Sequence, residues 1–283
     1  MGILSGLGSM GIDVKDGSLF AEDKKKTAEA AAAAEEKDPV ALEAEELLKR
    51  TATCPVCGKE FQYLSVKANR VRLLGQDIDL RPKYEQLDSL KYNVIMCHEC
   101  GYAARVQSFK DVSTKQKQMI REKIGANYRN DDHDEDKTTY DYDTAIRRYQ
   151  RALGTAIVKG AKSSEIAYLC LQTAWIVRGK RESLDKNSPS YEADFKECVA
   201  NENELLNNSL EGFKKARSSE DFPMCGMDEY TVDYIIAAVA VKCGQNDVAT
   251  RLLSELIVSK TANNRIKDKA RTLKDLIMEQ KKQ

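Results

Sequence analysis

The chain has 283 residues, in which 45 lysine and arginine residues balance 45 aspartate and glutamate residues, so its overall charge excludes a strong attraction to nucleic acid or to an anionic membrane. No stretch approaches 18 consecutive apolar residues, and no basic region, apolar run and cleavage site follow one another at the amino terminus, so neither a membrane span nor a secretory signal is expected. The 42% of hydrophobic and 32% of charged residues, with only five prolines, are typical of a soluble, mostly helical protein.

The first 50 residues are predicted to form a flexible tail and a solvated helix. Residues 1–22 are rich in glycine, and residues 23–37 contain an alanine run without a large apolar face to bury. Asp38 and Pro39 then have the residue types of a helix N-cap and first helical position. We expect a short helix from there, with Leu42, Leu47 and Leu48 on one side.

Four cysteines form two Cys-x-x-Cys pairs, and a glycine follows each pair. This spacing lets one tight turn direct two sulfur atoms at a single point, and the glycine accepts the positive φ of such a turn. Four thiolates complete a tetrahedral shell for zinc and leave no position for water. We therefore predict one structural zinc ion rather than two disulfides or four unrelated core cysteines. The expected ligands are Cys54, Cys57, Cys97 and Cys100, and the glycines are Gly58 and Gly101.

The other four cysteines stand singly in or beside predicted helices, and we expect them to behave as small apolar residues rather than as ligands. They are Cys170, Cys198, Cys225 and Cys243. A set of zinc-binding thiols together with scattered single thiols fits a reducing compartment better than an oxidising one. The predicted location is therefore the cytoplasm.

Apolar and polar residues alternate on both sides of the cysteine pairs, which predicts short antiparallel strands that bring the pairs together. The alternating residues are Phe61, Tyr63 and Ser65 after the first pair, then Tyr92, Val94 and Met96 before the second, and Val106 after it. The 39 residues from Gly58 to Met96 exceed the length of a compact zinc ribbon, so a folded insertion is expected. An extended segment and a short helix are predicted in it.

The remainder of the chain is predicted to form helical hairpins. Thr114–Ile124 is the first expected helix, with Asp111 or Ser113 as its cap, and an acidic solvated linker at 127–137 follows it rather than a cation site. The later expected helices are 141–158, one that Ser163 caps, a long one from Ser188-Pro189, 228–243, 247–259 and 265–280.

The helix at 141–153 resembles the second helix of a tetratricopeptide repeat, with Tyr142, Ala145, Tyr149, Ala152 and Leu153 at the positions that the pattern requires. The segment 244–257 resembles the same pattern, although Leu256 replaces the usual alanine. The terminal proline is missing, and residues 188–217 exceed the length of a repeat helix. The resemblance therefore implies two or three degenerate hairpins rather than a regular solenoid.

The whole arrangement resembles a bacterial family known as domain of unknown function 2225, over roughly residues 50–280. The resemblance depends on the motifs Cys54-Pro-Val-Cys57-Gly-Lys-Glu-Phe61, the segment 70–84 with Asp77-x-Asp79, Lys91-Tyr-Asn-Val94, Cys97-His-Glu-Cys100-Gly-Tyr-Ala-Ala104 and residues 264–271. It implies a mainly α protein with a small β zinc-ribbon-like module and tetratricopeptide-like helical hairpins, and it implies no activity. The expected divisions are 1–50, 51–126 and 138–283.

Three functions remain open from the sequence. The favoured one is an interaction scaffold, in which the helical part binds a protein or peptide and Tyr149, Trp175 and Arg178 line the groove. Nucleic-acid binding by the ribbon is the alternative, supported by an excess of three positive charges between residues 54 and 110. A hydrolase that uses Asp77 and Asp79, with His98, is the third. We expect instead that these aspartates pair with Arg70, Arg72 or Arg81.

Overall fold

The computed structural model describes residues 38–68, 71–130 and 136–280. The predictions for the tail at 1–22, for the helix at 23–37 and for most of the acidic run at 131–136 fall outside these residues. The chain divides into two compact units, Met1–Glu46 and Leu47–Gln283. The first of these contains helix α2 (Pro39–Glu45).

Helix α2 begins where the sequence predicts. The Asp38 side chain caps it by accepting a hydrogen bond from the Val40 N–H at 3.1 Å, and Pro39 is the first helical residue. The predicted extension to Leu47 and Leu48 is wrong, because both leucines belong to strand β1 (Leu47–Thr53). Strand β1 pairs antiparallel with β2 (Glu60–Val66), so the ladder takes up the backbone groups that a longer helix would have used.

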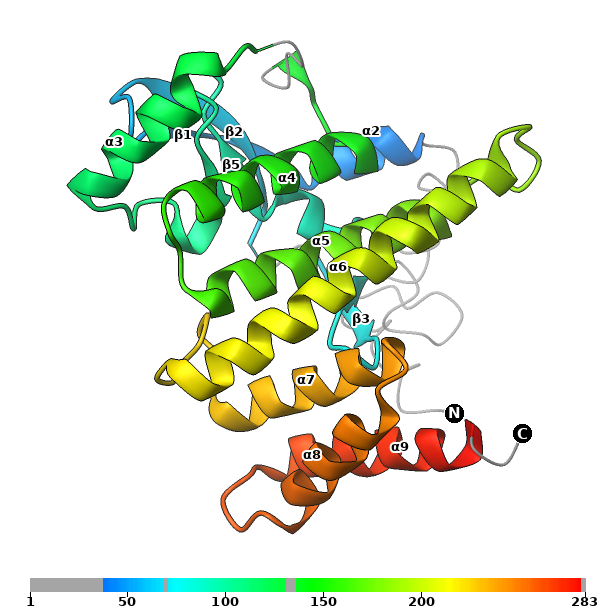
Figure 1. Ribbon diagram of the computed structural model, residues 1–283. Helices are drawn as coiled ribbons and strands as arrows, with labels where there is room; N and C mark the ends of the chain where they lie inside the picture. Colours follow the sequence, from blue (N-terminus) through cyan, green and yellow to red (C-terminus); the bar gives the residue numbers. More distant parts are fainter. Residues whose placement is uncertain (1–37, 69–70, 131–135, 281–283) are drawn as a thin grey trace, which may run out of the picture. The chain divides into compact units, whose positions relative to one another are not determined.

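The β structure consists of three separate two-stranded antiparallel sheets (Figure 1). Besides β1 and β2, these are β3 (Leu73–Gln76) with β4 (Pro82–Tyr84), and β5 (Val94–Met96) with β6 (Ala103–Arg105). The predicted insertion thus contains the extended hairpin β3–β4 and a short 3-10 helix, η3 (Ser89–Tyr92). The predicted alternation fails at β5, where Tyr92 already belongs to η3 and all three strand residues are buried. Val106 likewise starts a 3-10 turn, η4 (Val106–Ser108).

Helices make up most of the described chain, which confirms the mainly α class. They are α3 (Thr114–Lys123), α4 (Tyr142–Val158), α5 (Ser163–Glu182), α6 (Tyr191–Ser219), α7 (Glu229–Lys242), α8 (Asn246–Val258) and α9 (Asn264–Gln280), with the 3-10 turn η5 (Gly125–Asn127) after α3. Ser113 forms a capping box with Gln116 at the start of α3. Helix α6 begins two residues beyond Pro189, because the Tyr191 N–H first closes a turn onto the Ser188 carbonyl at 3.0 Å.

Within residues 47–283 the helices α4 to α9 pack against one another largely in chain order (Figure 1). Helix α5 lies between α4 and α6 and is buried on almost every side, including Leu169, Leu171 and Ile176. Among the described helices, none has both the length and the apolar character that a bilayer crossing requires. The likeness of these hairpins to tetratricopeptide repeats stays a prediction.

Strands β5 and β6 share one hydrophobic core with the helices. Val94 and Met96 of β5 and Ala103 of β6 belong to the same buried cluster as Ala145 and Tyr149 of α4. The Tyr149 hydroxyl also donates a hydrogen bond of 3.0 Å to the Leu90 carbonyl of η3. The predicted division at residues 126 and 138 therefore crosses a common core, although whether the two parts fold independently stays a prediction.

Candidate metal centre

The two Cys-x-x-Cys turns have the same backbone geometry. In the first, the Gly58 N–H donates to the Cys54 carbonyl, and the Cys54 N–H donates to the Lys59 carbonyl, both at 2.9 Å. The second turn repeats these bonds at the corresponding positions, at 2.9 and 2.8 Å. Gly58 and Gly101 have φ angles of +78° and +68°, as the sequence predicts, and any larger residue would strain the turn there.

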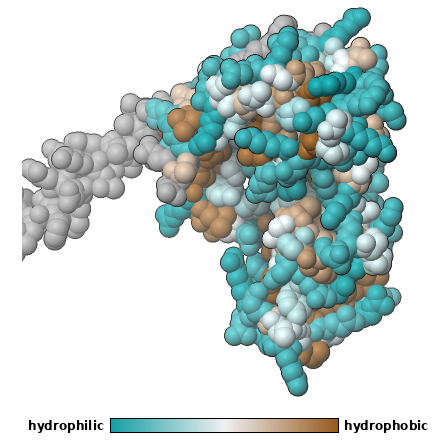
Figure 2. Space-filling view, turned by 90° about the vertical axis from the view of Figure 1, so that its left-hand side faces the viewer, coloured by the Kyte–Doolittle hydropathy of each residue, from teal (hydrophilic) through white to brown (hydrophobic). Residues whose placement is uncertain are grey.

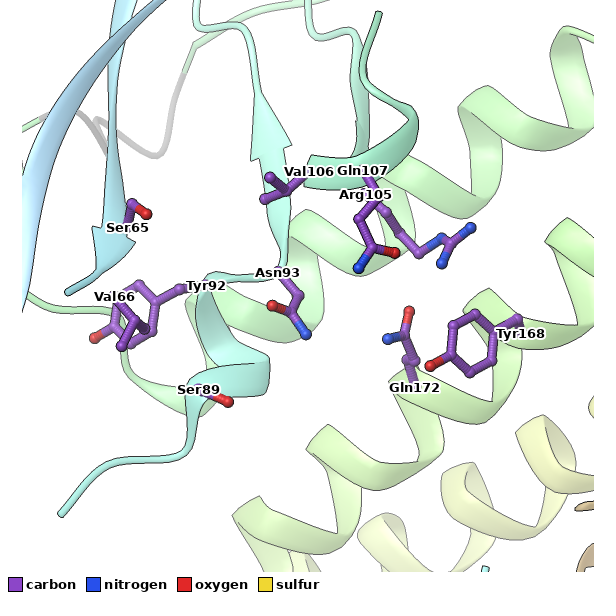
Figure 3. Close-up of a pocket in the computed structure, with 10 residues that line it drawn as sticks. All are labelled: Ser65, Val66, Ser89, Tyr92, Asn93, Arg105, Val106, Gln107, Tyr168 and Gln172. Carbon is purple, nitrogen blue, oxygen red and sulfur yellow. The ribbon is translucent and has the colours of Figure 1, made fainter. Parts of the chain in front are cut away.

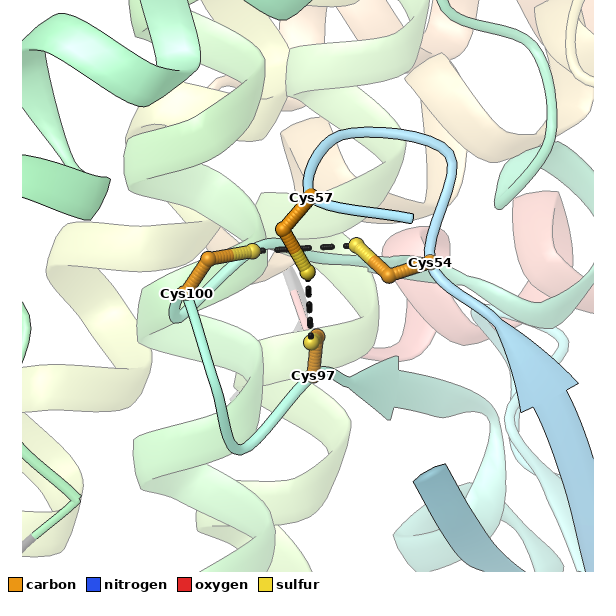
Figure 4. A group of neighbouring side chains, drawn as sticks. All are labelled: Cys54, Cys57, Cys97 and Cys100. Atoms are coloured by element: carbon orange, nitrogen blue, oxygen red, sulfur yellow. Dashed lines mark hydrogen bonds between the residues drawn. The ribbon is translucent and has the colours of Figure 1, made fainter. Parts of the chain in front are cut away.

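These turns bring the four predicted thiols together (Figure 4). The sulfurs of Cys54 and Cys100 are 3.6 Å apart, those of Cys57 and Cys97 are 3.7 Å apart, and all four lie within 4.8 Å of one another. Four sulfurs around one tetrahedral zinc ion, each about 2.3 Å from it, would be about 3.8 Å apart. The thiol positions therefore suit a metal ion held by four thiolates.

The four thiols also influence one another's ionisation. The hydrogen bond between the Cys54 and Cys100 sulfurs lowers the pKa of Cys54 to about 2 and raises the pKa of Cys100, because one proton is held between two sulfurs. Without a cation, ionisation of one thiol opposes ionisation of its neighbour. A bound divalent metal ion would relieve this conflict, because direct coordination stabilises the thiolate form of each ligand.

The surroundings of the thiols hold the first turn in place and exclude water. The Arg121 side chain of α3 donates to the Val56 carbonyl, between the first two cysteines, through Nε at 2.7 Å and also through a terminal nitrogen. Val56 is fully buried, and Phe61, Tyr102 and Phe109 pack beside it in the same hydrophobic cluster. The turn is therefore fixed by contacts beyond the thiols themselves, and such hydrogen bonds and packing orient the ligands of a metal ion.

The four thiols would leave a bound metal ion no open ligand position. The His98 ring, between Cys97 and Cys100 in sequence, is 3.2 Å from the Gln62 carbonyl through Nε2 and is not part of the thiol cluster. Cys170, Cys198, Cys225 and Cys243 also lie outside it, within the described residues. A closed set of four thiolates is typical of a structural metal site and not of a catalytic one.

A second set of functional side chains lies at the tip of the β3–β4 hairpin. Arg178 of α5 donates to both carboxylate oxygens of Asp79, at 2.6 and 3.1 Å, and to Asp77 at 2.9 Å. Its Nε donates to Glu202 of α6 at 2.8 Å. Asp79 is completely buried, and the Tyr234 hydroxyl of α7 holds the neighbouring Ile78 carbonyl at 2.9 Å. The hairpin is thus attached directly to α5 and α7, and Arg178 connects it to α6.

The expected partners of the aspartates are only partly correct. Arg70 lies outside the described residues. Arg81 lies 3.8 Å from Asp77, but the closest guanidinium among the described residues belongs to Arg178, about one hundred residues further along the chain. Burial alone would raise the pKa of Asp77, yet hydrogen bonds from Lys83 and Arg178 outweigh burial and keep this pKa below its ordinary value. The β3–β4 hairpin is therefore attached to the helices through these carboxylates, while Leu87 of the same insertion packs against Leu47 and Leu64 of β1 and β2.

The three residues predicted to line a partner groove are all buried. Tyr149 is 0% exposed, and Trp175 and Arg178 are each 3% exposed. Arg178 is fully engaged with carboxylates, and Tyr149 belongs to the core shared with η3. Contact of a protein or peptide partner with these three residues stays a prediction.

Sequence reasoning missed Arg121, which holds the first cysteine turn, and Glu202, which completes the Arg178 cluster. A charged residue on the predicted apolar face of a helix is the signal for such a role. Glu202 follows Val199 and precedes Leu206, at the three- and four-residue spacing of the α6 seam, so it had that signal. Arg121 follows Ile120 and has no comparable signal.

A family model described as "Uncharacterized protein conserved in bacteria (DUF2225)" matches residues 47–277. The match begins at the first residue of β1 and ends within α9, so it includes the cysteine turns, the hairpin and the helices. Neither the curated proteins nor the solved structures that were compared include a match. Since the family model covers far more than half of the chain, this protein belongs to that bacterial family.

Proposed function

We propose that this protein is a cytoplasmic interaction scaffold, in which one structural zinc ion fixes the ribbon and the helical part binds an acidic protein or peptide. Zinc is favoured by the all-thiolate, tetrahedral donor set. A reducing compartment is favoured because the ligands must remain thiolates. The observation that carries the partner proposal is a groove between the β3–β4 hairpin and α9.

This groove has a volume of about 610 Å³. Ile78 at the hairpin tip and Leu273 of α9 contribute its apolar part, together with the Tyr234 ring. Leu73 and Leu74 on the same hairpin are 48% and 61% exposed, so apolar surface continues along the strand beyond the groove. A concave site that combines apolar and polar side chains suits a peptide segment better than a flat surface does.

The charges of the groove favour an acidic partner. Its two acids already have basic neighbours, because Asp77 is bound by Lys83 and Arg178 and Asp268 pairs with Arg271 at 2.6 Å. Arg265 and Lys269, by contrast, have no carboxylate at ion-pair distance within the described chain. Burial, and then the neighbouring Arg265, lower the pKa of Lys269, because both disfavour its charged form. An acidic group of a partner would offset this effect and would be attracted to both cations.

The test uses the full chain and two variants of α9. Lys269→Glu reverses a charge in the groove, whereas Lys267→Glu makes the same change on a residue of the same helix that does not line it. Partners captured by wild-type protein from bacterial lysate should be lost with Lys269→Glu and retained with Lys267→Glu. Equal retention by both variants would contradict the proposed groove.

Nucleic-acid binding is the second candidate, and a separate cavity of about 460 Å³ between α3 and α4 favours it. Lys123, Arg147 and Arg151 line this cavity, and no acidic residue does. The Arg151 guanidinium lies 5.1 Å from the centre of the Tyr128 ring, which leaves a planar cation near the surface. Binding of single-stranded RNA that weakens steeply with salt, and that Arg151→Glu reduces, would establish this function instead.

We propose no enzymatic role. The four thiolates offer a metal ion no open position for a substrate or water, and Arg178 holds both Asp77 and Asp79. A carboxylate bound in this way is a poor proton acceptor, because the arginine stabilises its ionised form. A hydrolytic activity that Asp77→Asn abolishes, with unchanged unfolding temperature, would overturn this part of the proposal.

A further inference from the structure

A cavity of about 290 Å³ lies between the β5–β6 hairpin and helix α5 (Figure 3). Arg105 and Gln107 enter it from the end of β6 and the turn η4, Tyr168 and Gln172 enter it from α5, and Asn93 lies between the two groups. This volume is close to the lower end of the range of small-molecule sites, about 300 Å³. The cavity is separate from the cysteine cluster and from the α9 groove.

Among the described residues, Arg105 is the only charged one that lines the cavity, and it is 7% exposed. Its guanidinium carbon lies 4.9 Å from the centre of the Tyr168 ring. Its Nε has no hydrogen-bond partner, and within the described residues no carboxylate lies at ion-pair distance. A buried cation without a counter-charge lowers stability, so its presence needs an explanation other than folding.

Two further buried polar atoms on the same side of α5 lack partners. Gln172 Oε1 has no hydrogen-bond donor, and Trp175 Nε1 has no acceptor. The spacing of Tyr168, Gln172 and Trp175 places all three on one helix face. A second cavity of about 340 Å³ shares Asn93, Tyr168 and Gln172 with the first and continues to Trp175.

The second cavity is more apolar than the first. Besides Trp175, its lining includes Leu80 from the β3–β4 turn, Met227 from the segment before α7, and Ile235 of α7. The two cavities together therefore provide a cation at one end, a hydrogen-bond acceptor and a donor along α5, and an apolar wall at the other end. A ligand that satisfies all of them must have an anion, an N–H or O–H group, an acceptor and an apolar part.

We propose that these cavities bind an N-acylated amino acid with a free carboxylate. The carboxylate pairs with Arg105, the amide N–H donates to Gln172 Oε1, the acyl oxygen accepts from Trp175 Nε1, and an apolar side chain packs on the wall near Ile235. A single guanidinium matches one negative charge, which disfavours a phosphate monoester. A free amino acid is disfavoured because no acidic residue lines either cavity to pair with its ammonium group.

The first experiment compares matched probes on the full zinc-loaded chain. N-acetylleucine should bind in calorimetry and shift the Nε–Hε resonance of Arg105, whereas N-acetylleucinamide, leucine and inorganic phosphate at the same concentration should not. Binding of the uncharged amide or of phosphate as strongly as the acid would overturn the assignment. Failure of N-acetylated acids with each apolar side chain to bind would overturn it as well.

The same chemistry occurs at the carboxyl-terminal residue of a peptide. A peptide that ends in leucine is therefore the second probe. Equal affinity for this peptide and for N-acetylleucine identifies a small free acid as the ligand, whereas much tighter binding of the peptide identifies a chain terminus. Both results support the assigned chemistry, and neither depends on the α9 groove, because Lys269→Glu should leave both affinities unchanged.

Variants separate a binding role of Arg105 from a structural one. Arg105→Met keeps the side-chain volume and removes the unpaired charge, so it should weaken N-acetylleucine binding at least tenfold and leave the unfolding temperature equal or higher. Gln172→Met should weaken binding in the same way. Arg50→Met, on exposed strand β1, is the control and should keep full affinity. A lower unfolding temperature with retained affinity in Arg105→Met would show a structural role and overturn the proposal.

Discussion

The cysteine cluster and the Arg178 cluster both join distant parts of the chain, but they do so by different means. In the first, Cys54 and Cys57 meet thiols 40 to 46 residues away through two identical backbone turns. In the second, one guanidinium meets the buried Asp79 and the partly buried Asp77, 99 to 101 residues away. The first is encoded by residue spacing, whereas the second exists only after α5, α6 and the hairpin have packed.

The cysteine cluster and the Arg178 cluster, the two junctions between distant parts of the chain, also differ in how they contribute free energy to folding. A structural metal ion supplies binding free energy directly, because the unfolded chain has no preformed site. A buried ion cluster gains little relative to apolar packing but is strongly destabilised when one partner is removed. Both junctions are therefore sensitive to substitution, the first through loss of a ligand and the second through unpaired buried charge.

The largest effect is expected from Cys97→Ser. Loss of one thiolate should abolish zinc binding, which contributes on the order of 10–16 kcal/mol in zinc-finger peptides. The predicted division between residues 126 and 138 would leave the helices intact, but β5 shares a core with α4, so we expect α4 and α5 to lose stability as well. Zinc content by mass spectrometry and thermal unfolding by circular dichroism measure the two effects.

Cys243→Ser is the control for this prediction, because Cys243 lies at the end of α7 and outside the cluster. It should keep one zinc ion per chain and a wild-type unfolding curve. If Cys97→Ser instead loses zinc while the helical signal melts at the wild-type temperature, the ribbon and the helices fold independently in spite of their common core.

The next largest effect is expected from Arg178→Met. This change leaves Asp79 and Glu202 buried without their shared cation, and breaking such a cluster costs about 3–5 kcal/mol. Zinc binding should persist, since the cysteine turns do not contact Arg178. Arg271→Met breaks an exposed pair with Asp268 on α9 and should cost roughly 0.5 kcal/mol or less. Denaturant unfolding with parallel zinc analysis distinguishes the two junctions.

The contrast explains which features the sequence could predict. Cysteine spacing and helix caps such as Ser113 and Asp38 are local, so the backbone bonds seen at Gly58 and Gly101 follow from neighbouring residues. The environment of helix α5 was harder to predict from the sequence. Its own residues are buried on almost every side, so no polar stripe marks an exposed face. An exposed binding face was therefore predicted at Trp175, whose side chain is buried in the structure.

The partner of a charged residue is the least predictable feature. Asp77-x-Asp79 indicated two acids on one face, and basic residues close in sequence were the natural candidates for pairing. Arg178 was available only because the hairpin packs against α5, which no local pattern specifies. The unpaired Arg105 could not be recognised for the same reason, since the absence of a counter-charge is visible only in three dimensions.

A smaller effect, with a definite pH dependence, is expected from Asp77→Asn. The folded state keeps the pKa of Asp77 below its ordinary value of 3.8, so the ionised carboxylate stabilises the fold above that pH. The variant should lose about 1 kcal/mol at neutral pH, the size of one exchanged hydrogen bond. The difference should shrink as the pH falls below about 3.8, where the wild-type carboxyl takes up its proton in the unfolded chain first.

Denaturant unfolding of both proteins from neutral to acidic pH measures this convergence. Asp268→Asn, on the exposed pair of α9, is the matched control and should show a much smaller difference at neutral pH. A gap between wild type and Asp77→Asn that stays constant, or widens, under acidic conditions would show that Asp77 is not held as a carboxylate by Lys83 and Arg178.

The smallest effect is expected from Lys59→Gln. Lys59 and Glu99 form a salt bridge of 2.6 Å that connects the two cysteine turns directly, so its position alone suggests an important link. However, the two side chains are 64% and 45% exposed, and water screens such a pair strongly. Zinc content and the unfolding midpoint should both match those of the wild type. A measurable loss of zinc in Lys59→Gln, restored by the swapped pair Lys59→Glu with Glu99→Lys, would mean that the turns depend on this surface contact as well as on their thiols.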